Sequence, residues 1–267
     1  MVLALNLHKA APAAPIRCAA TLDGTDWYLS PEQADSAALI SAVSVRRALP
    51  ARAATIAIAT ALQESKLSNI SHGDRDSVGL FQQRPSQGWG TREQILDPVF
   101  STNAFYDALI KIDGYQALPI TDAAQRVQRS GFPQAYAQHE TLSRSWASAL
   151  AGYSPAALTC TLGAGPKGAT DAQMEAFRAR VQRDWGDVAL QRESTGWSTD
   201  VTPVAWAAAD PTRASWAFAQ WTVAVADGNR VTAVAVADRQ WSRAKGTWST
   251  VRPEASLPPG TVRITLG

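Results

Sequence analysis

Directly after Pro50 the chain carries an almost unbroken run of small and apolar residues. The centre of the run reads Ala-Ala-Thr-Ile-Ala-Ile-Ala-Thr-Ala-Leu, and the proline ahead of it favours a helix that starts at the next residue. A helix that is apolar on every side is buried on every side. We therefore expect a central helix over residues 51–66, whose last turn brings Glu64 to the surface between Gln63 and Ser65.

Helical patterns surround this central helix, and one polar segment interrupts them. Further helices are expected at residues 31–49, with Ser30 as the N-cap, and at 98–112, 121–130 and 133–150. The stretch 68–90 is too rich in Gly, Asp, Ser and Pro to be helical and suits a small hairpin or a loop. Together these patterns predict a mainly helical domain over residues 18–160.

A glycine-rich segment at residues 163–168 indicates a linker, which we place at 161–170. Beyond it, two more helices are expected at 171–185 and 211–226, with short alternating strands at 231–236, 240–241, 246–251 and 260–266. Residues 171–267 are therefore expected to form a smaller α+β domain of unknown role, and the whole chain an α+β fold. Seven of the ten tryptophans lie in this part, and we expect them in its core rather than on a carbohydrate-binding face.

The composition is that of a globular protein, with 46% hydrophobic and 18% charged residues. A net charge of +2 gives no argument for a nucleic-acid partner. The three histidines are scattered, only two cysteines are present and no glycine-rich phosphate loop appears, so neither a metal site nor a cofactor is expected. Residues 1–17 suit the remnant of an export signal or membrane anchor followed by a spacer, or an ordinary disordered N-terminus.

Glu64 admits two interpretations. A glutamate at the end of a buried helix can simply be a surface residue that falls there. Alternatively it is a general acid, because apolar surroundings favour the neutral form of a carboxyl group and raise its pKa. Cleavage of a glycosidic bond needs such a proton, since the leaving sugar oxygen is otherwise too basic to depart.

The segment that follows, Gly73-Asp74-Arg75-Asp76-Ser77-Val78-Gly79-Leu80-Phe81-Gln82-Gln83, favours the second interpretation. Glu64-Ser65 with Ser77-Val78-Gly79-Leu80-Phe81-Gln82 resembles the Glu-Ser and Ser-x-Gly-Leu-Met-Gln signature of the lytic transglycosylases. Gly73-Asp74-Arg75 ahead of Gly-Leu-x-Gln is also similar to goose-type lysozyme. Residues 18–160, including the stretch 124–133, resemble wall-associated actinobacterial proteins that carry this lysozyme-like domain.

The resemblance implies a lysozyme-like fold, in which a buried helix presents the catalytic glutamate to a cleft beside a small hairpin. It implies that Glu64 is the general acid. By position, it assigns substrate contacts to Ser77, Gly79, Gln82 and Gln83, and Gly79 would let the chain turn closely against the sugar.

Two cysteines complete the resemblance. From the residues alone, Cys18 and Cys160 are compatible with unrelated buried thiols or with a clamp that joins the ends of one domain. The resemblance covers both and implies that they form a disulfide in an exported protein.

Some positions depart from the family pattern or stay open. Asp74 matches the second acidic position of goose-type lysozyme, and it either orients a water or stabilises a turn. Arg84 stands where that family can have another aspartate. Ala135-Tyr136-Ala137 keeps two residues of the Ala-Tyr-Asn motif of transglycosylases, so Tyr136 is either a substrate contact or a core aromatic. Trp89, flanked by glycines, either stacks on a sugar or packs against the protein.

The resemblance implies cleavage of the β-1,4 bond between N-acetylmuramic acid and N-acetylglucosamine in peptidoglycan. We expect a lytic transglycosylase that needs Glu64 alone. The alternatives are a hydrolytic muramidase that uses Asp74 to position water, and a wall-binding or scaffold protein with weak activity. We expect the protein to be secreted or bound to the cell surface or cell wall, and residues 171–267 to be available to a protein partner.

Overall fold

Two antiparallel sheets and eight α-helices make up the described part of the chain, which is residues 15–128, 133–202 and 204–267 of a computed structural model. The fold class is α+β, as expected from the sequence. The helices are α1 (Pro31–Arg46), α2 (Ala51–Ser65), α3 (Arg92–Leu96), α4 (Pro98–Leu109), α5 (Ile120–Gln128), α6 (Glu140–Leu150), α7 (Asp171–Trp185) and α8 (Pro211–Ala224). Short 3-10 helices are η1 (Pro85–Gln87), η2 (Pro133–His139) and η3 (Pro253–Ala255).

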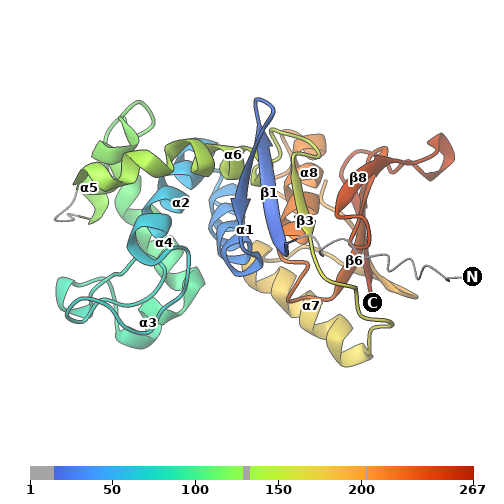
Figure 1. The fold of residues 1–267 in the computed structure, drawn as a ribbon, viewed down its shortest axis with the longest axis horizontal. Helices are drawn as coiled ribbons and strands as arrows, with labels where there is room; N and C mark the ends of the chain where they lie inside the picture. The colour runs from blue at the N-terminus through green and yellow to red at the C-terminus, as the bar shows by residue number, and fades with distance from the viewer. Residues whose placement is uncertain (1–14, 129–132, 203) are drawn as a thin grey trace, which may run out of the picture.

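Helix α2 is the centre of the helical part, as its apolar sequence predicts. It packs against α1, α4, α5 and α6, and all of its residues from Ala53 to Leu62 are buried. The preceding helix α1 begins where expected, because Ser30 caps it in a capping box with Gln33 and Pro31 occupies its first turn. In Figure 1, α2 to α5 lie at one end of the molecule, and α1 lies between them and the strands.

A three-stranded sheet that the sequence did not predict closes the first 160 residues. Its order is β2 (Thr25–Leu29), β1 (Arg17–Leu22) and β3 (Leu158–Thr161), all antiparallel. Cys18 and Cys160 are direct neighbours in the β1–β3 register and form a disulfide, which confirms the predicted pair. The bond joins residues 142 positions apart and so fixes both ends of this part of the chain.

The second sheet has six strands and carries the four predicted ones. Its order is β4 (Gln191–Glu193), β5 (Gly196–Asp200), β9 (Thr261–Leu266), β6 (Val231–Val236), β7 (Arg239–Ser242) and β8 (Thr247–Thr250). Burial alternates along β9, as expected of a strand with one face on the core. The prediction for the tryptophans is confirmed: Trp185, Trp197, Trp216, Trp221 and Trp241 are buried, and Trp206 and Trp248 pack against the core.

The last hundred residues pack directly on the helical part. Helix α8 contacts α1, α6 and β3, and the buried side chain of Gln220 accepts from Leu158 N at 2.9 Å and donates to Ala149 O at 2.6 Å. Arg180 of α7 pairs with Asp35 of α1. Figure 1 shows the six-stranded sheet at the end opposite α2 to α5, with the three-stranded sheet between. The domain boundaries at residues 160 and 171 stay a prediction.

Three sequence-based expectations need correction or fall outside the described residues. Residues 68–90 contain no hairpin strands, only an isolated bridge between Val78 and Gln83, because positive φ angles at Gly79 and Gln82 turn the chain too tightly for a ladder. The helix expected over 133–150 is split into η2 and α6. Most of the expected anchor remnant or spacer at 1–17 lies outside the described residues.

Candidate active site

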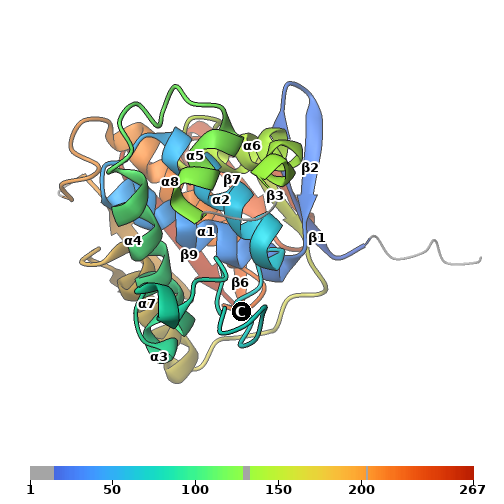
Figure 2. The same ribbon diagram turned by 90° about the vertical axis from the view of Figure 1, so that its left-hand side faces the viewer.

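The end of α2 is fixed against the loop that follows it. Lys66 and Leu67 have φ angles of 56° and 60°, which end the helix and redirect the chain. The Ser65 hydroxyl donates to the backbone oxygen of Leu80 at 2.7 Å. Glu64, in the last turn, is therefore held by a buried helix on one side and by the loop on the other. These elements lie at the left of Figure 1, and Figure 2 views the molecule from that side.

The Glu64 carboxyl is partly buried and has two hydrogen-bond donors. The Tyr136 hydroxyl, from η2, donates to Glu64 Oε1 at 2.6 Å, and the Gln128 side chain from the end of α5 also bonds to this carboxyl. Burial raises the pKa of Glu64 above its ordinary value, while the bonds from Tyr136 and Gln128 and the charge of Arg84 lower it. Burial is the largest of these effects, so Glu64 retains its proton to a higher pH than an exposed glutamate does.

Arg84 organises the acidic residue and the serine of the loop. Its Nη2 donates to Asp74 Oδ2 at 2.9 Å, and its Nε donates to Ser77 Oγ at 2.9 Å. Asp74 is exposed, with 78% of its side chain accessible, whereas Ser77 is buried. The guanidinium thus holds Asp74 and Ser77 while its charge acts on Glu64. The structure links these three predicted residues through Arg84, which the sequence had marked only as a departure from the family pattern.

Three other residues predicted to contact substrate make contacts within the protein. Gly79 has φ +81°, and a Cβ on it would lie 2.8 Å from the backbone oxygen of Ile95, so protein packing rather than a sugar requires this glycine. The Gln82 amide bonds to loop carbonyl oxygens at 3.3 and 3.4 Å. Gln83 is 1% exposed and donates to Ser101 O at 3.2 Å.

Tyr136 and Trp89 were each left open between binding and packing. Tyr136 is fully buried and its hydroxyl reaches Glu64, so it positions the candidate acid. Trp89 is partly buried and lines a groove of about 610 Å³. The groove residues are Gln87, Trp89, Ala108, Lys111, Ile112, Arg126, Val127 and Gln128. Gln128 lines the groove and also interacts with the Glu64 carboxyl, although Glu64 itself does not line the groove.

Gln128 is a neighbour of the candidate acid that the sequence analysis did not identify. Its side chain donates to Phe81 O at 2.6 Å and also bonds to Glu64, so it joins α5 to the loop and to the acid. It is separated from Glu64 by more than sixty positions, and the resemblance over the stretch 124–133, which includes it, assigned it no role. The helical pattern over 121–130 did place it at the end of a helix, but nothing in that pattern shows what the helix end faces.

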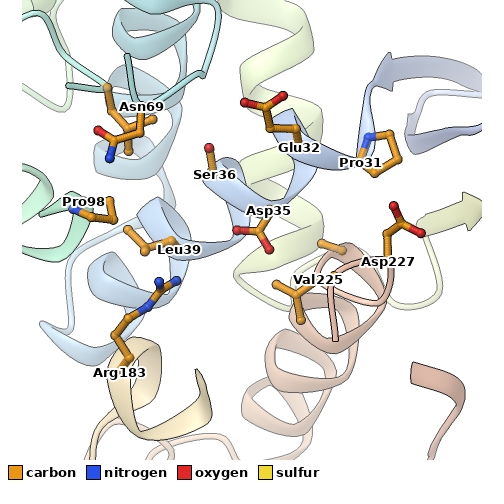
Figure 3. A pocket seen from close by; sticks show the side chains of 13 residues that line it. Pro31, Glu32, Asp35, Ser36, Leu39, Asn69, Pro98, Arg183, Val225 and Asp227 are labelled. Carbon is orange, nitrogen blue, oxygen red and sulfur yellow. The ribbon is translucent and has the colours of Figure 1, made fainter. Parts of the chain in front are cut away.

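A second cavity lies between the two parts of the chain, and Glu64 does not line it. It measures about 380 Å³ and is lined by residues of α1, α7 and the segment after α8, and also by Asn69, Leu80 and Pro98 (Figure 3). Asp35 and Asp227 on its wall already pair with Arg180 and Arg243. None of the residues predicted for the site lines this cavity, so we place the candidate active site at Glu64.

The comparisons with known proteins add no name to this geometry: neither a family model nor a curated protein matches the chain. Among the described residues, no three His, Cys, Asp or Glu side chains gather in a way that could hold a metal ion. No described helix is long and apolar enough to cross a membrane. The arrangement is therefore interpreted from its own chemistry, which is that of one protonatable carboxyl beside a groove.

Proposed function

We propose that this protein cleaves the β-1,4 bond between N-acetylmuramic acid and N-acetylglucosamine of peptidoglycan, with Glu64 as the general acid. The observation that carries the proposal is the partly buried Glu64 carboxyl, which burial keeps protonated to higher pH and which Tyr136 and Gln128 hold in place. The adjoining groove offers room for a glycan and the face of Trp89 for a sugar ring.

The proposed reaction needs no second carboxylate. Protonated Glu64 donates its proton to the bridging oxygen, the glycosidic bond breaks, and positive charge develops at the anomeric carbon of the muramic acid. The C6 hydroxyl oxygen of the same sugar then attacks this carbon, and ionised Glu64 removes the hydroxyl proton. The products are a 1,6-anhydro sugar and a chain with a free 4-hydroxyl, and Glu64 regains its proton. This is a lytic transglycosylase reaction.

The bond between Arg84 and Asp74 favours this outcome over hydrolysis. A hydrolytic muramidase needs a base to activate water on the opposite face of the sugar. One oxygen of Asp74 is engaged by Arg84 at 2.9 Å, which directs that oxygen to the guanidinium and leaves it less free to hold a water. Hydrolysis through Asp74 is the second candidate. In that case Asp74→Asn abolishes cleavage, whereas the transglycosylase reaction survives the same change.

The remaining alternative is a protein that binds the wall without cleaving it. Purified peptidoglycan is incubated with wild type, Glu64→Gln and the matched control Glu254→Gln, which changes an exposed glutamate of η3. We expect wild type and the control to solubilise the wall and Glu64→Gln to bind it without solubilising it. Equal inertness of wild type and Glu64→Gln would overturn the proposed enzyme.

We also propose that the protein works outside the cell, secreted or attached to the wall. The disulfide between Cys18 and Cys160 supports this location, since such bonds persist in oxidising compartments and are rare in the cytosol. Peptidoglycan is found in the same location, so the proposed compartment and the proposed substrate agree.

A further inference from the structure

Two unpaired cations stand on the wall of the groove beside Glu64. Lys111 follows the end of α4 and Arg126 lies on α5, and both are exposed. None of the described residues that line the groove is acidic. Across the part of the chain that the structure describes, neither Lys111 nor Arg126 forms an ion pair, whereas Asp107 nearby is already paired with Arg47. The groove therefore presents two positive charges that form no direct ion pair with the described residues.

The rest of the lining is suited to a sugar chain. Trp89 offers an aromatic face, and Ile112 and Val127 add apolar surface. Gln128 stands both on the groove wall and in contact with Glu64, so a glycan in the groove extends toward the acid. Cationic side chains beside an aromatic face recognise a ring that carries an anionic substituent better than a neutral ring.

We propose that Lys111 and Arg126 bind carboxylates carried on the substituents of the glycan, and so make the site selective for an anionic glycan over a neutral one. In peptidoglycan these carboxylates belong to the peptide stem, or to the lactyl group of muramic acid where no stem is attached, whereas a chitin oligosaccharide has neither. The inference rests on the proposed function, to which it adds a pair of specificity-determining residues.

The test measures binding, so that it does not depend on turnover. The Glu64→Gln protein, which is expected not to cleave, is titrated with uncrosslinked glycan strands that carry peptide stems, and separately with chitohexaose. The same titrations are made with a variant that carries Lys111→Gln and Arg126→Gln in addition to Glu64→Gln. A matched control adds Lys245→Gln with Arg252→Gln, which removes one lysine and one arginine charge from exposed positions elsewhere. Thermal melting confirms that each variant is folded.

We expect the groove double substitution to weaken binding of the strands about tenfold and to leave chitohexaose unchanged. The control substitution leaves both unchanged, and raised salt reduces the difference between parent and groove variant. In strands that carry stems the lactyl carboxyl is bonded to the stem as an amide. An amidase hydrolyses this amide, which removes the stem and leaves a free lactyl carboxylate. If the groove substitution also weakens binding of the treated strands, the groove accepts the freed lactyl carboxylate; if only untreated strands respond, the groove recognises the carboxylates of the stem.

Three results would overturn the inference: strands that bind the groove variant as tightly as the parent, an equal loss for chitohexaose, or a parent that does not bind the strands. Cleavage by wild-type protein is measured alongside. If cleavage depends on Glu64 but the substitutions at Lys111 and Arg126 do not change strand binding, the inference is refuted and the proposed function stands. Selective binding of anionic strands with no cleavage refutes the proposed function alone.

Discussion

Removal of the Tyr136 hydroxyl should move the pH dependence of cleavage upward. In Tyr136→Phe the ring still fills its buried site, but Glu64 Oε1 loses a donor at 2.6 Å. A hydrogen bond to an ionised group contributes about 1.5–3 kcal/mol, and we use the lower figure because Gln128 and Arg84 remain beside the carboxyl. A loss of that size for the ionised form corresponds to about one pH unit.

The sign follows from the role of Glu64. A general acid works while it is protonated, so activity falls as pH rises through its pKa. Since the hydroxyl of Tyr136 lowers the pKa of Glu64, its removal raises that pKa, and the alkaline limb of the profile shifts to higher pH. The assay is the initial rate of wall solubilisation from pH 4 to pH 9 in steps of about 0.5 unit, at constant ionic strength.

Tyr28→Phe is the matched control for this experiment. The Tyr28 hydroxyl also donates to a carboxylate, Asp26 Oδ2 at 3.2 Å, but on the exposed β1–β2 hairpin. It should leave the profile unchanged. An alkaline limb that stays in place in Tyr136→Phe, or that moves to lower pH, would refute the assignment of Glu64 as the titrating acid.

Three further predictions concern stability. Because the pKa of Glu64 is raised in the folded protein, ionised Glu64 destabilises the fold above the pKa of the unfolded chain. Glu64→Gln should therefore have a higher melting temperature than wild type at pH 7.5, and the difference should be smaller at pH 4. A lower melting temperature of Glu64→Gln at pH 7.5 would contradict this. Paired substitution of Cys18 and Cys160 by serine should lower the free energy of unfolding in urea by about 3–5 kcal/mol, and a change under about 1 kcal/mol would count against the clamp. Gly79→Ala should lower the free energy of unfolding by about 2–4 kcal/mol, because φ is +81° and Ile95 O lies 2.8 Å from the new methyl group. Unchanged stability with weaker glycan binding would instead favour a contact between Gly79 and the sugar.

Local signals predicted most helices and the later strands. Ser30 and Pro31 predict the start of α1, and the apolar run after Pro50 predicts the buried helix α2. The sheet of β1, β2 and β3 could not be predicted in the same way. Its strands are short, Arg17–Leu22 shows no apolar alternation, and its partner Leu158–Thr161 lies far along the chain, so the pairing depends on tertiary contacts.

The candidate acid could be found from sequence, but its surroundings could not. Glu64 stands at the end of a buried helix, and the apolar run after Pro50 is enough to show that. The contacts that decide its chemistry come from Arg84, Gln128 and Tyr136, which lie in three other segments. Gly79 was expected to turn the chain closely against a sugar, and the close neighbour that the structure shows is the Ile95 backbone. A motif indicates which residues matter, whereas packing decides what each of them touches.

Mass spectrometry of the soluble fragments from purified peptidoglycan tests the role of Glu64 most directly. Wild-type protein is predicted to release fragments that end in 1,6-anhydro-N-acetylmuramic acid, one water lighter than hydrolytic products, and Glu64→Gln is predicted to release none. Fragments with reducing ends would show that the protein hydrolyses the bond, as the alternative proposes. An absence of fragments from wild type, or the same fragments from Glu64→Gln, would contradict the assignment of Glu64 as the acid that cleaves the glycan.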